Sequence, residues 1–286
     1  MVAIQEATFL KAVQKFEPEP LPERPRVSVF FPVYNDERTV ERVALKSLDV
    51  LSRMAREYEV VIVDDATPCR AGEIADRLAA NDPRIRVIHH SKNLGYGAAI
   101  RTGLANVRYE WVCFTDGDDE YDIYDLEKLI RLRHRYDLII TFRYAKLYST
   151  FRIFVSWVYN RSLRALFKSR FRDISTGLRL IRRDLVNELD LKSNSPFIGA
   201  EIAIKTMLKG FPVGEVGIQT FPREFGHGSA TSWRNIIATI KDMISCYRTI
   251  FSAGYDPPAY REQHRNSTAT LACSRNPQSS NRLDPP

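Results

Sequence analysis

Short, nearly uncharged runs alternate with longer amphipathic stretches along the first half of the chain. The runs are rich in β-branched and aromatic residues, which is typical of strands buried on both faces of a sheet. They cover residues 27–33, 59–63, 85–89 and 110–115. The stretches between them predict helices over 37–58, capped by Asn35 or Asp36, over 71–80, and after the glycine-containing turn within 93–107.

The pattern becomes less regular after Tyr121. It predicts a strand at 138–142, an extended segment at 213–221, and helices at 126–135, 151–171 (one helix or a pair), 201–208 and 235–251. Strand–helix alternation predicts an α/β fold with a Rossmann-like, mostly parallel central sheet flanked by helices, followed by C-terminal amphipathic helices.

The two ends of the chain differ from this pattern. Residues 1–25 are punctuated by prolines and predict a flexible segment, and residues 253–286 are polar and predict a disordered tail. Between them we expect a catalytic domain over 26–232 and an amphipathic helix over 233–252.

Composition narrows the class of protein. With 286 residues, 44% of them hydrophobic and 27% charged, the chain is typical of a globular protein. The net charge of +7 favours anionic partners: phosphorylated substrates, an anionic lipid surface or nucleic acid. Four scattered cysteines give neither a disulfide framework nor zinc-like spacing, which favours the cytoplasm. We expect no signal peptide and no spanning helix, because no apolar run approaches the ~18 residues that a bilayer requires.

Polar and acidic residues follow four of the predicted strands. Ligands of parallel α/β sheets bind beyond the carboxyl ends of the strands, so these residues are expected to converge on one edge. They are Tyr34-Asn35-Asp36, Asp64-Asp65, Asn93-Leu94-Gly95 and Asp116-Gly117-Asp118.

The last of these segments has the chemistry of a metal site. Asp116 and Asp118 are one residue apart and Glu120 continues the alternate spacing, so their carboxylates can face a shared point. Oxygen ligands of this kind suit Mg²⁺ or Mn²⁺, and a cation is needed where carboxylates meet a diphosphate. An acidic loop that caps the following helix is the alternative.

The order and spacing of six segments resemble family 2 glycosyltransferases with the GT-A fold, and among them the dolichyl-phosphate mannose synthase-like and polyprenyl-phosphate glycosyltransferases. The resemblance runs from Arg26 to Thr231. The segments are FPVYNDE, VVIVDDATP, NLGYGAAIRTG, TFRY, DISTGLRLIRRDL and FPREFGHGSAT, in addition to the acidic segment.

The resemblance implies a set of donor-binding residues. Pro32, Tyr34 and Glu37 match the loop that lines the nucleotide base and ribose, and Asp65 matches an acid that contacts the base. Asp116 then lies near the ribose and diphosphate, Asp118 is the main metal ligand, and Glu120 stands where the subgroup often has a glutamine ligand. Gly95, with Gly97, permits close backbone approach or simply forms a helix-entry turn.

The resemblance also implies an acceptor side. Arg143, Arg152 and Arg223 match guanidinium groups around the acceptor phosphate and leaving diphosphate, with a solvated basic face as the alternative. Asp173 and Glu201 match the remaining acids; one would be the base for a hydroxyl acceptor, whereas an ionised phosphate acceptor needs only orientation. His227 either reaches a phosphate or is a plain loop residue. The lack of an acid after Glu201 and of a QxxRW motif argues against a processive synthase.

The basic amphipathic stretch at 151–171 and the helix at 235–251 suit either a membrane interface or packing on the domain. The predicted function is transfer of a hexose from a UDP- or GDP-sugar, with inversion, to a polyprenyl phosphate, by a protein peripheral to the cytoplasmic face of a membrane. A hydroxyl acceptor is the alternative. A dehydrogenase is disfavoured because GxGxxG is missing after the first strand, and nucleic acid because acids at four strand ends repel phosphodiesters.

Overall fold

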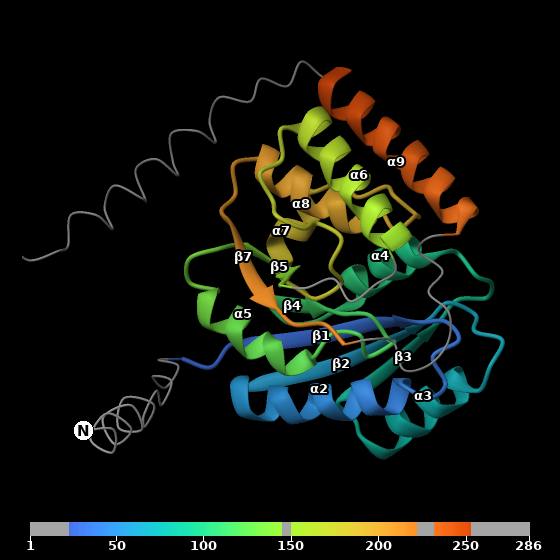
Figure 1. Cartoon of the computed structure of the whole chain (residues 1–286). Helices are drawn as coiled ribbons and strands as arrows, with labels where there is room; N and C mark the ends of the chain where they lie inside the picture. Colours follow the sequence, from blue (N-terminus) through green and yellow to red (C-terminus); the bar gives the residue numbers. More distant parts are fainter. Residues whose placement is uncertain (1–22, 145–149, 222–231, 253–286) are drawn as a thin grey trace, which may run out of the picture.

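The computed structural model describes residues 23–144, 150–221 and 232–252. Over these residues a seven-stranded sheet runs in the order β3-β2-β1-β4-β6-β5-β7, with helices on both of its faces (Figure 1). The strands are β1 (Arg26–Val33), β2 (Glu57–Asp64), β3 (Ile85–His89), β4 (Trp111–Phe114), β5 (Leu138–Arg143), β6 (Arg179–Arg182) and β7 (Val213–Ile218).

The helices connect successive strands and close the C-terminal part. They are α2 (Val40–Met54), α3 (Ala71–Asn81), α4 (Tyr96–Asn106), the 3₁₀ turn η1 (Ile123–Asp125), α5 (Leu126–Leu132), α6 (Thr150–Phe167), α7 (Arg183–Glu188), α8 (Ile198–Leu208) and α9 (Trp233–Ser252). The stretch at 151–171 therefore contains one helix, α6, rather than a pair.

The predicted α/β fold with a mostly parallel sheet is confirmed. Strands β1 to β4 pair in parallel, as do β5 and β7, and β6 alone runs antiparallel to its neighbours β4 and β5. Strand β6 was not predicted, because its four residues, RLIR, begin and end with arginine. These charges obscure the apolar signal of a buried strand.

Two hydrophobic clusters cover the two faces of the sheet. Alternate residues of a strand point to opposite faces, so in β1 Val29 and Phe31 enter the cluster shared with α2 and α5, and Phe30 enters the other. That second cluster includes residues of α4, α6, α8 and α9. Met243 and Cys246 of α9 belong to it, so α9 is part of the packed body (Figure 1).

The first helix begins later than predicted. Residues 37–58 were expected to be helical with a cap at Asn35 or Asp36, but α2 covers only Val40–Met54. The Asp36 carboxylate accepts the backbone N–H of Tyr34 instead, at 3.0 Å, and so closes a turn after β1. The residue before α2 is Thr39, with no side-chain cap, so the predicted capping by Asn35 or Asp36 is wrong.

Of the predicted end segments, residues 1–22 and 253–286 lie outside the described part of the chain. Within the three described ranges, none of the helices combines the length and the apolar character that crossing a bilayer requires.

Helix α4 approaches the sheet closely at Gly103. A Cβ at this position would overlap the ring of the fully buried Phe30, 2.7 Å from its Cγ. We therefore expect Gly103→Ala to lower the free energy of unfolding by about 1–3 kcal/mol, although alanine is the better helix former by ~1 kcal/mol. Urea denaturation measures the change. Asn106→Ala, at the exposed end of α4, is the control and should change stability by under ~0.5 kcal/mol; a Gly103→Ala protein as stable as wild type would contradict the packing.

Candidate functional site

Three strand ends meet at one edge of the sheet. Strand β1 lies between β2 and β4, and the order along the chain reverses there, which is where ligands of open α/β sheets bind. The N–H of Asp65 donates to the carbonyl of Val33 at 3.1 Å, joining the β2 end to the β1 end. The hydroxyl of Thr39 donates to the carbonyl of Gly117 at 2.6 Å, joining the β1 side to the β4 end.

The backbone passes through the left-handed region in the segment that follows each of these strands. Asn35 after β1, Ala66 after β2 and Asp119 after β4 have φ values of 65°, 54° and 59°. Such conformations are costly for residues other than glycine, and they cluster at functional sites. Thr67 holds two of these turns, because its hydroxyl accepts the N–H of Asn35 at 2.9 Å and its own N–H donates to Asp64 at 2.9 Å.

Within the acidic segment the side chains separate into two directions. Asp119 turns toward α2, where it pairs with Arg42 at 2.6 Å and Lys46 at 3.0 Å. Asp118 is buried and accepts the N–H of Glu120 at 3.0 Å. Asp116 accepts the hydroxyl of Tyr96 at 2.7 Å. Asp119 therefore anchors the loop on α2, whereas its neighbours stay at the strand edge.

Tyr96, at the start of α4, orients the Asp116 carboxylate. Burial, and then the negative charge of Asp116, raise the pKa of the Tyr96 hydroxyl well above its ordinary value. The hydroxyl therefore stays protonated and donates. Tyr96 was not predicted as a site residue, although its position between the two glycines of the predicted turn, Gly95 and Gly97, was an available signal.

Asp65 fixes the turn that enters α4. Its carboxylate accepts the N–H groups of Leu94 at 2.8 Å and Gly95 at 2.9 Å, and bonds to His90 at 2.8 Å. Gly95 has φ 93°, and a Cβ there would lie 3.0 Å from the carbonyl oxygen of Asn194. Both observations account for a glycine at this position. The acid that the resemblance gives a nucleotide contact is thus also the support of the neighbouring loop.

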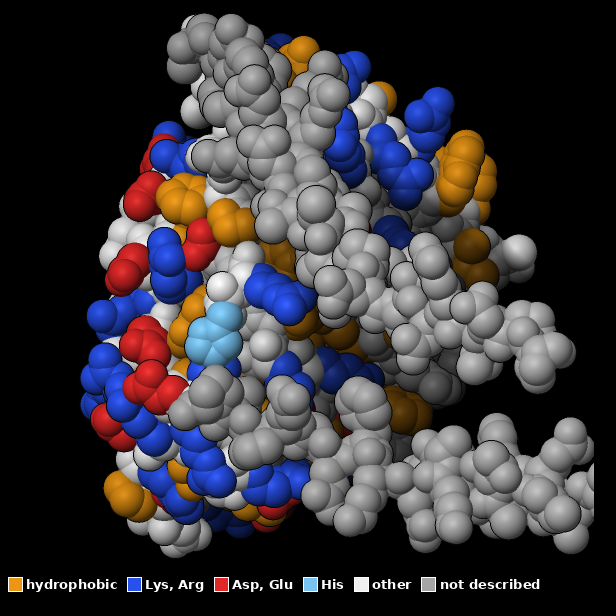
Figure 2. Space-filling view, turned by 90° about the vertical axis from the view of Figure 1, so that its left-hand side faces the viewer, with side chains coloured by type: hydrophobic (Ala, Val, Ile, Leu, Met, Phe, Trp, Pro, Cys, Tyr) orange, Lys and Arg blue, Asp and Glu red, His pale blue; other side chains and the backbone are white. Residues whose placement is uncertain are grey.

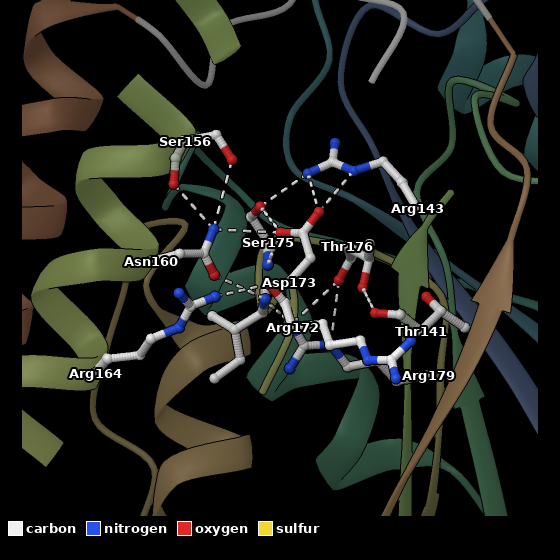
Figure 3. A network of polar contacts seen from close by, with 11 residues as sticks. Thr141, Arg143, Ser156, Asn160, Arg164, Arg172, Asp173, Ser175, Thr176 and Arg179 are labelled. Atoms are coloured by element: carbon white, nitrogen blue, oxygen red, sulfur yellow. Dashed lines mark hydrogen bonds and ion pairs between the residues drawn. The ribbon is translucent and has the colours of Figure 1, made fainter. Parts of the chain in front are cut away.

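A second group of polar residues surrounds Asp173, between the end of β5 and α6 (Figure 3). Arg143 donates from Nε and Nη2 to one oxygen of Asp173 at 2.9 and 2.7 Å, and both side chains are almost fully buried. The other oxygen accepts the hydroxyl of Ser175 at 2.5 Å and the amide of Asn160 at 3.4 Å. Asn160 in turn accepts the N–H of Ile174 at 3.1 Å, which ties the turn to α6.

Gly177 joins this group to the acidic segment. A Cβ on Gly177 would lie 2.7 Å from Cγ of Asp116, so the 173–177 segment passes directly against that carboxylate. Only glycine allows this approach. The 173–177 segment thus contacts the acidic strand end at Gly177 and Arg143 at Asp173.

Arg179 is fully buried below the site. Its guanidinium donates to the carbonyls of Ile174, Thr176 and Gly199, and it lies 5.8 Å from the centroid of the Phe114 ring. Burial lowers its pKa, and the charge of Asp116 opposes that effect. Arg179 was missed as well; an arginine inside the otherwise apolar run GLRLI was the available signal.

The remaining predicted residues differ in burial, and two of them lie outside the described part of the chain. Pro32 is buried one residue before the end of β1, Tyr34 is exposed after that strand, and Glu37 accepts the N–H of Arg70 at 3.4 Å, toward α3. Arg152 is half-buried on α6. Arg223 and His227 lie outside the described residues.

Glu201 has a different local setting. It is buried on α8, where its carboxylate bonds to Lys205 at 2.6 Å and accepts the N–H groups of Lys192 and Ser193. These contacts hold the 192–193 loop on the helix, so the structure gives Glu201 a structural role.

Comparison with known proteins identifies the family. Residues 28–190, more than half of the chain, match the model of glycosyl transferase family 2. The chain belongs to this family. Its predicted membership and its activity as a glycosyltransferase are thereby confirmed.

Two relatives illustrate the range of the family. An undecaprenyl-phosphate mannosyltransferase of Micrococcus luteus is 30% identical over 213 residues, 70% of this chain and 86% of the relative. Glycosyltransferase AglD of Haloferax volcanii is 30% identical over 207 residues, 69% of this chain and 33% of AglD. The chain thus spans about a third of AglD. The Micrococcus luteus relative is named for an undecaprenyl-phosphate acceptor, which agrees with the resemblance to polyprenyl-phosphate glycosyltransferases.

The GT-A fold is also confirmed by solved structures. Glucosyl-3-phosphoglycerate synthase from Mycobacterium tuberculosis, in complex with Mn²⁺, UDP and phosphoglyceric acid, superposes with a TM-score of 0.62. The match covers 79% of this chain and 78% of the synthase at 16% identity, which establishes a common fold.

Carboxylates at the end of β4 are the kind of ligand that a hard divalent cation prefers. Asp116 and Asp118 offer oxygen ligands, and magnesium is usually held by one or two carboxylates together with substrate phosphates. Among the residues that the structure describes, no three His, Cys, Asp or Glu side chains form a ready-made metal cluster. Asp118 and the predicted third ligand, Glu120, are both buried after the strand end, so burial does not separate the two, and Glu120 stays a predicted ligand.

Beside the site, His89 links β3 to α3 and β2. It bonds to Asp64 at 2.8 Å and to Asp76 at 3.0 Å, and these bonds raise its pKa. A raised pKa in the folded state stabilises the protein below the ordinary value of about 6.5, and this stabilisation is lost as pH rises through the folded value.

We therefore expect His89→Gln to destabilise the protein more at about pH 5.5 than at about pH 8.5. The difference should be under ~1 kcal/mol, because the histidine is partly exposed. Urea denaturation at both pH values measures it, with His134→Gln as the control for losing an exposed histidine. An equal effect of His89→Gln at the two pH values would contradict the assignment.

Proposed function

We propose that this family 2 glycosyltransferase moves a hexose from a UDP- or GDP-linked donor to a polyprenyl phosphate, with inversion at the anomeric carbon. The observation that supports this best is the contact of Gly177 with Asp116. It joins an acidic strand end, suited to a metal-bound diphosphate, to a buried arginine–aspartate pair at the end of β5. This contact supports a donor site and an acceptor site that lie next to each other.

The donor half lies at the ends of β1, β2 and β4. Asp116 and Asp118 would hold Mg²⁺ or Mn²⁺, which would neutralise the diphosphate as it leaves. The 34–37 loop and the turn at Gly95 would line the nucleotide, with Asp65 keeping that turn in place. The relative crystallised with Mn²⁺ and UDP supports a donor of this kind.

The acceptor half favours a phosphate over a hydroxyl group. A hydroxyl acceptor requires a carboxylate to take up its proton, whereas a phosphate is already ionised at neutral pH. Asp173 is engaged by Arg143, Ser175 and Asn160, and Glu201 by Lys205. Asp173 then serves to position Arg143 beside the incoming phosphate. The mannosyltransferase from Micrococcus luteus, named for its undecaprenyl-phosphate acceptor, supports this choice.

A donor screen tests the proposal. Purified protein is incubated with UDP- and GDP-hexoses and Mn²⁺ or Mg²⁺, with and without a short-chain polyprenyl phosphate. We expect release of nucleoside diphosphate from one donor, dependent on the lipid phosphate, and a β-linked product from an α-linked donor by NMR. Release stimulated equally by a soluble saccharide, or retention of the anomeric configuration, would overturn the acceptor or the stereochemical assignment.

Two variants within the acidic segment test the metal assignment. Asp118→Asn should lower turnover at least about a hundredfold, because a bound cation contributes several kcal/mol to transition-state stabilisation. Asp119→Asn is the matched control: this side chain faces Arg42 and Lys46, and asparagine tolerates its positive φ. It should keep most of the activity and the metal dependence. Equal losses in the two variants would argue against a specific metal ligand at Asp118.

A further inference from the structure

Helix α9 exposes a narrow apolar stripe. Trp233, Ile237, Ile240 and Ile244 recur at spacings of four, three and four residues, which brings them onto one side of a helix. Their exposed fractions range from 43% to 76%, far above those of core residues. Large apolar side chains gathered in this way on a surface indicate an interaction site.

Basic residues run beside this stripe at heptad spacing. Arg234, Lys241 and Arg248 each lie seven residues apart, and the first two directly follow members of the stripe, Trp233 and Ile240. All three are exposed. The acid of this helix, Asp242, faces the protein, where it accepts the N–H groups of Asn194 and Ser195 at 3.2 and 3.0 Å.

Helix α6 repeats the same composition. Ile153, Phe154, Trp157 and Val158 are between 38% and 60% exposed, and Phe154 and Trp157 stack with ring centroids 6.2 Å apart. The helix contains three arginines and no acid. At the upper right of Figure 2, Lys and Arg side chains lie beside hydrophobic ones.

The two helices lie side by side. Phe167 at the end of α6 contacts Tyr247 and Phe251 of α9, with ring centroids 5.9 and 6.5 Å apart (Figure 1). We call the exposed residues of the preceding paragraphs, four apolar ones from each helix with the α9 cations, the α6–α9 face. This face is connected to the site, because Asn160 of α6 holds Asp173 and its turn (Figure 3).

We infer that the α6–α9 face binds the surface of an anionic phospholipid bilayer, with the apolar side chains in the interface and the cations on lipid phosphates. Exposed aromatic and aliphatic residues flanked by Lys and Arg are the composition of interfacial helices. The idea that a lipid-linked phosphate approaches Arg143 from this face rests on the proposed function. As a membrane-binding surface, the α6–α9 face stands on the exposed side chains alone.

Charge distinguishes a bilayer from a second copy of the chain. A symmetric dimer through this face would set its cations against the same cations of the other copy, and like charges across an interface are costly. An anionic surface complements them instead.

Vesicle flotation tests the inference with the full chain. We expect binding to phosphatidylcholine vesicles that contain phosphatidylglycerol, weak binding to phosphatidylcholine alone, and loss of binding in ~1 M salt, where the Debye length falls to about 3 Å. The triple variant Arg234→Gln, Lys241→Gln, Arg248→Gln should bind about a hundredfold more weakly. Trp157→Ser with Ile240→Ser should bind at least about tenfold more weakly.

Matched controls come from the opposite layer of the protein. Arg53→Gln, Arg70→Gln and Arg77→Gln remove three exposed arginines, one from α2, one just before α3 and one within α3, and Leu45→Ser removes an exposed leucine of α2. These variants should bind vesicles as wild type does. The inference would be overturned if the α9 triple variant bound vesicles as tightly as wild type, or if the control variants lost as much binding as the α6–α9 variants. A dimer in solution that the α6–α9 variants dissociate would also overturn it.

The two proposals fail separately. Flotation requires no turnover, so vesicle binding without nucleotide release from any donor would remove the proposed function and leave the surface. Turnover of a short-chain acceptor without binding to anionic vesicles would rule out the membrane-binding surface and leave the proposed function. If both hold, the α9 triple variant should keep its activity on the short-chain acceptor and lose it on a long-chain acceptor in vesicles.

Discussion

Repulsion among carboxylates at one sheet edge is the constraint on which the rest of the site depends. The strand order β2-β1-β4 brings acids from several strand ends together, and each has to be neutralised, hydrogen-bonded or matched by a ligand. The protein meets this with different partners: backbone N–H groups for Asp65, cations of α2 for Asp119, and the Tyr96 hydroxyl for Asp116. The acidic side chains therefore point in different directions, and the carboxylates of Asp116 and Asp118 stay at the edge where a nucleotide sugar would bind.

The hydrogen bonds of Asp173 link the candidate site to the outer helix α6. Asp173 is held by Arg143 from the sheet and by Asn160 from α6, so the helix that carries exposed aromatic residues also shapes the acceptor side. A shift of α6 on a lipid surface would act directly on the Arg143–Asp173 pair. The fold therefore sets the proposed donor chemistry in the rigid parallel half of the sheet and the acceptor chemistry next to the surface that we assign to the membrane.

Much of this arrangement was predictable from the sequence, and the rest depended on tertiary contacts. Buried parallel strands have a strong local signal, so the hydrophobic pattern is sufficient to place the acids that follow them on a common edge. Strand β6 could not be found in this way, because its terminal arginines are satisfied only in the folded protein. The approach of Gly177 to Asp116 is likewise a contact between distant segments. The pairing of Glu201 with Lys205 follows from their i,i+4 spacing and could have been expected from the sequence, whereas its role as a site acid stays a prediction.

The central claim is that the edge carboxylates and a nucleoside diphosphate bind one divalent cation together. Titration of Mn²⁺ followed by electron paramagnetic resonance, with and without UDP or GDP, measures this coupling in the intact protein. The account predicts that one of the nucleotides tightens Mn²⁺ binding by about 5- to 150-fold, and that Asp118→Asn abolishes the effect. Equal Mn²⁺ affinity with and without either nucleotide, or coupling that survives in Asp118→Asn, would contradict it.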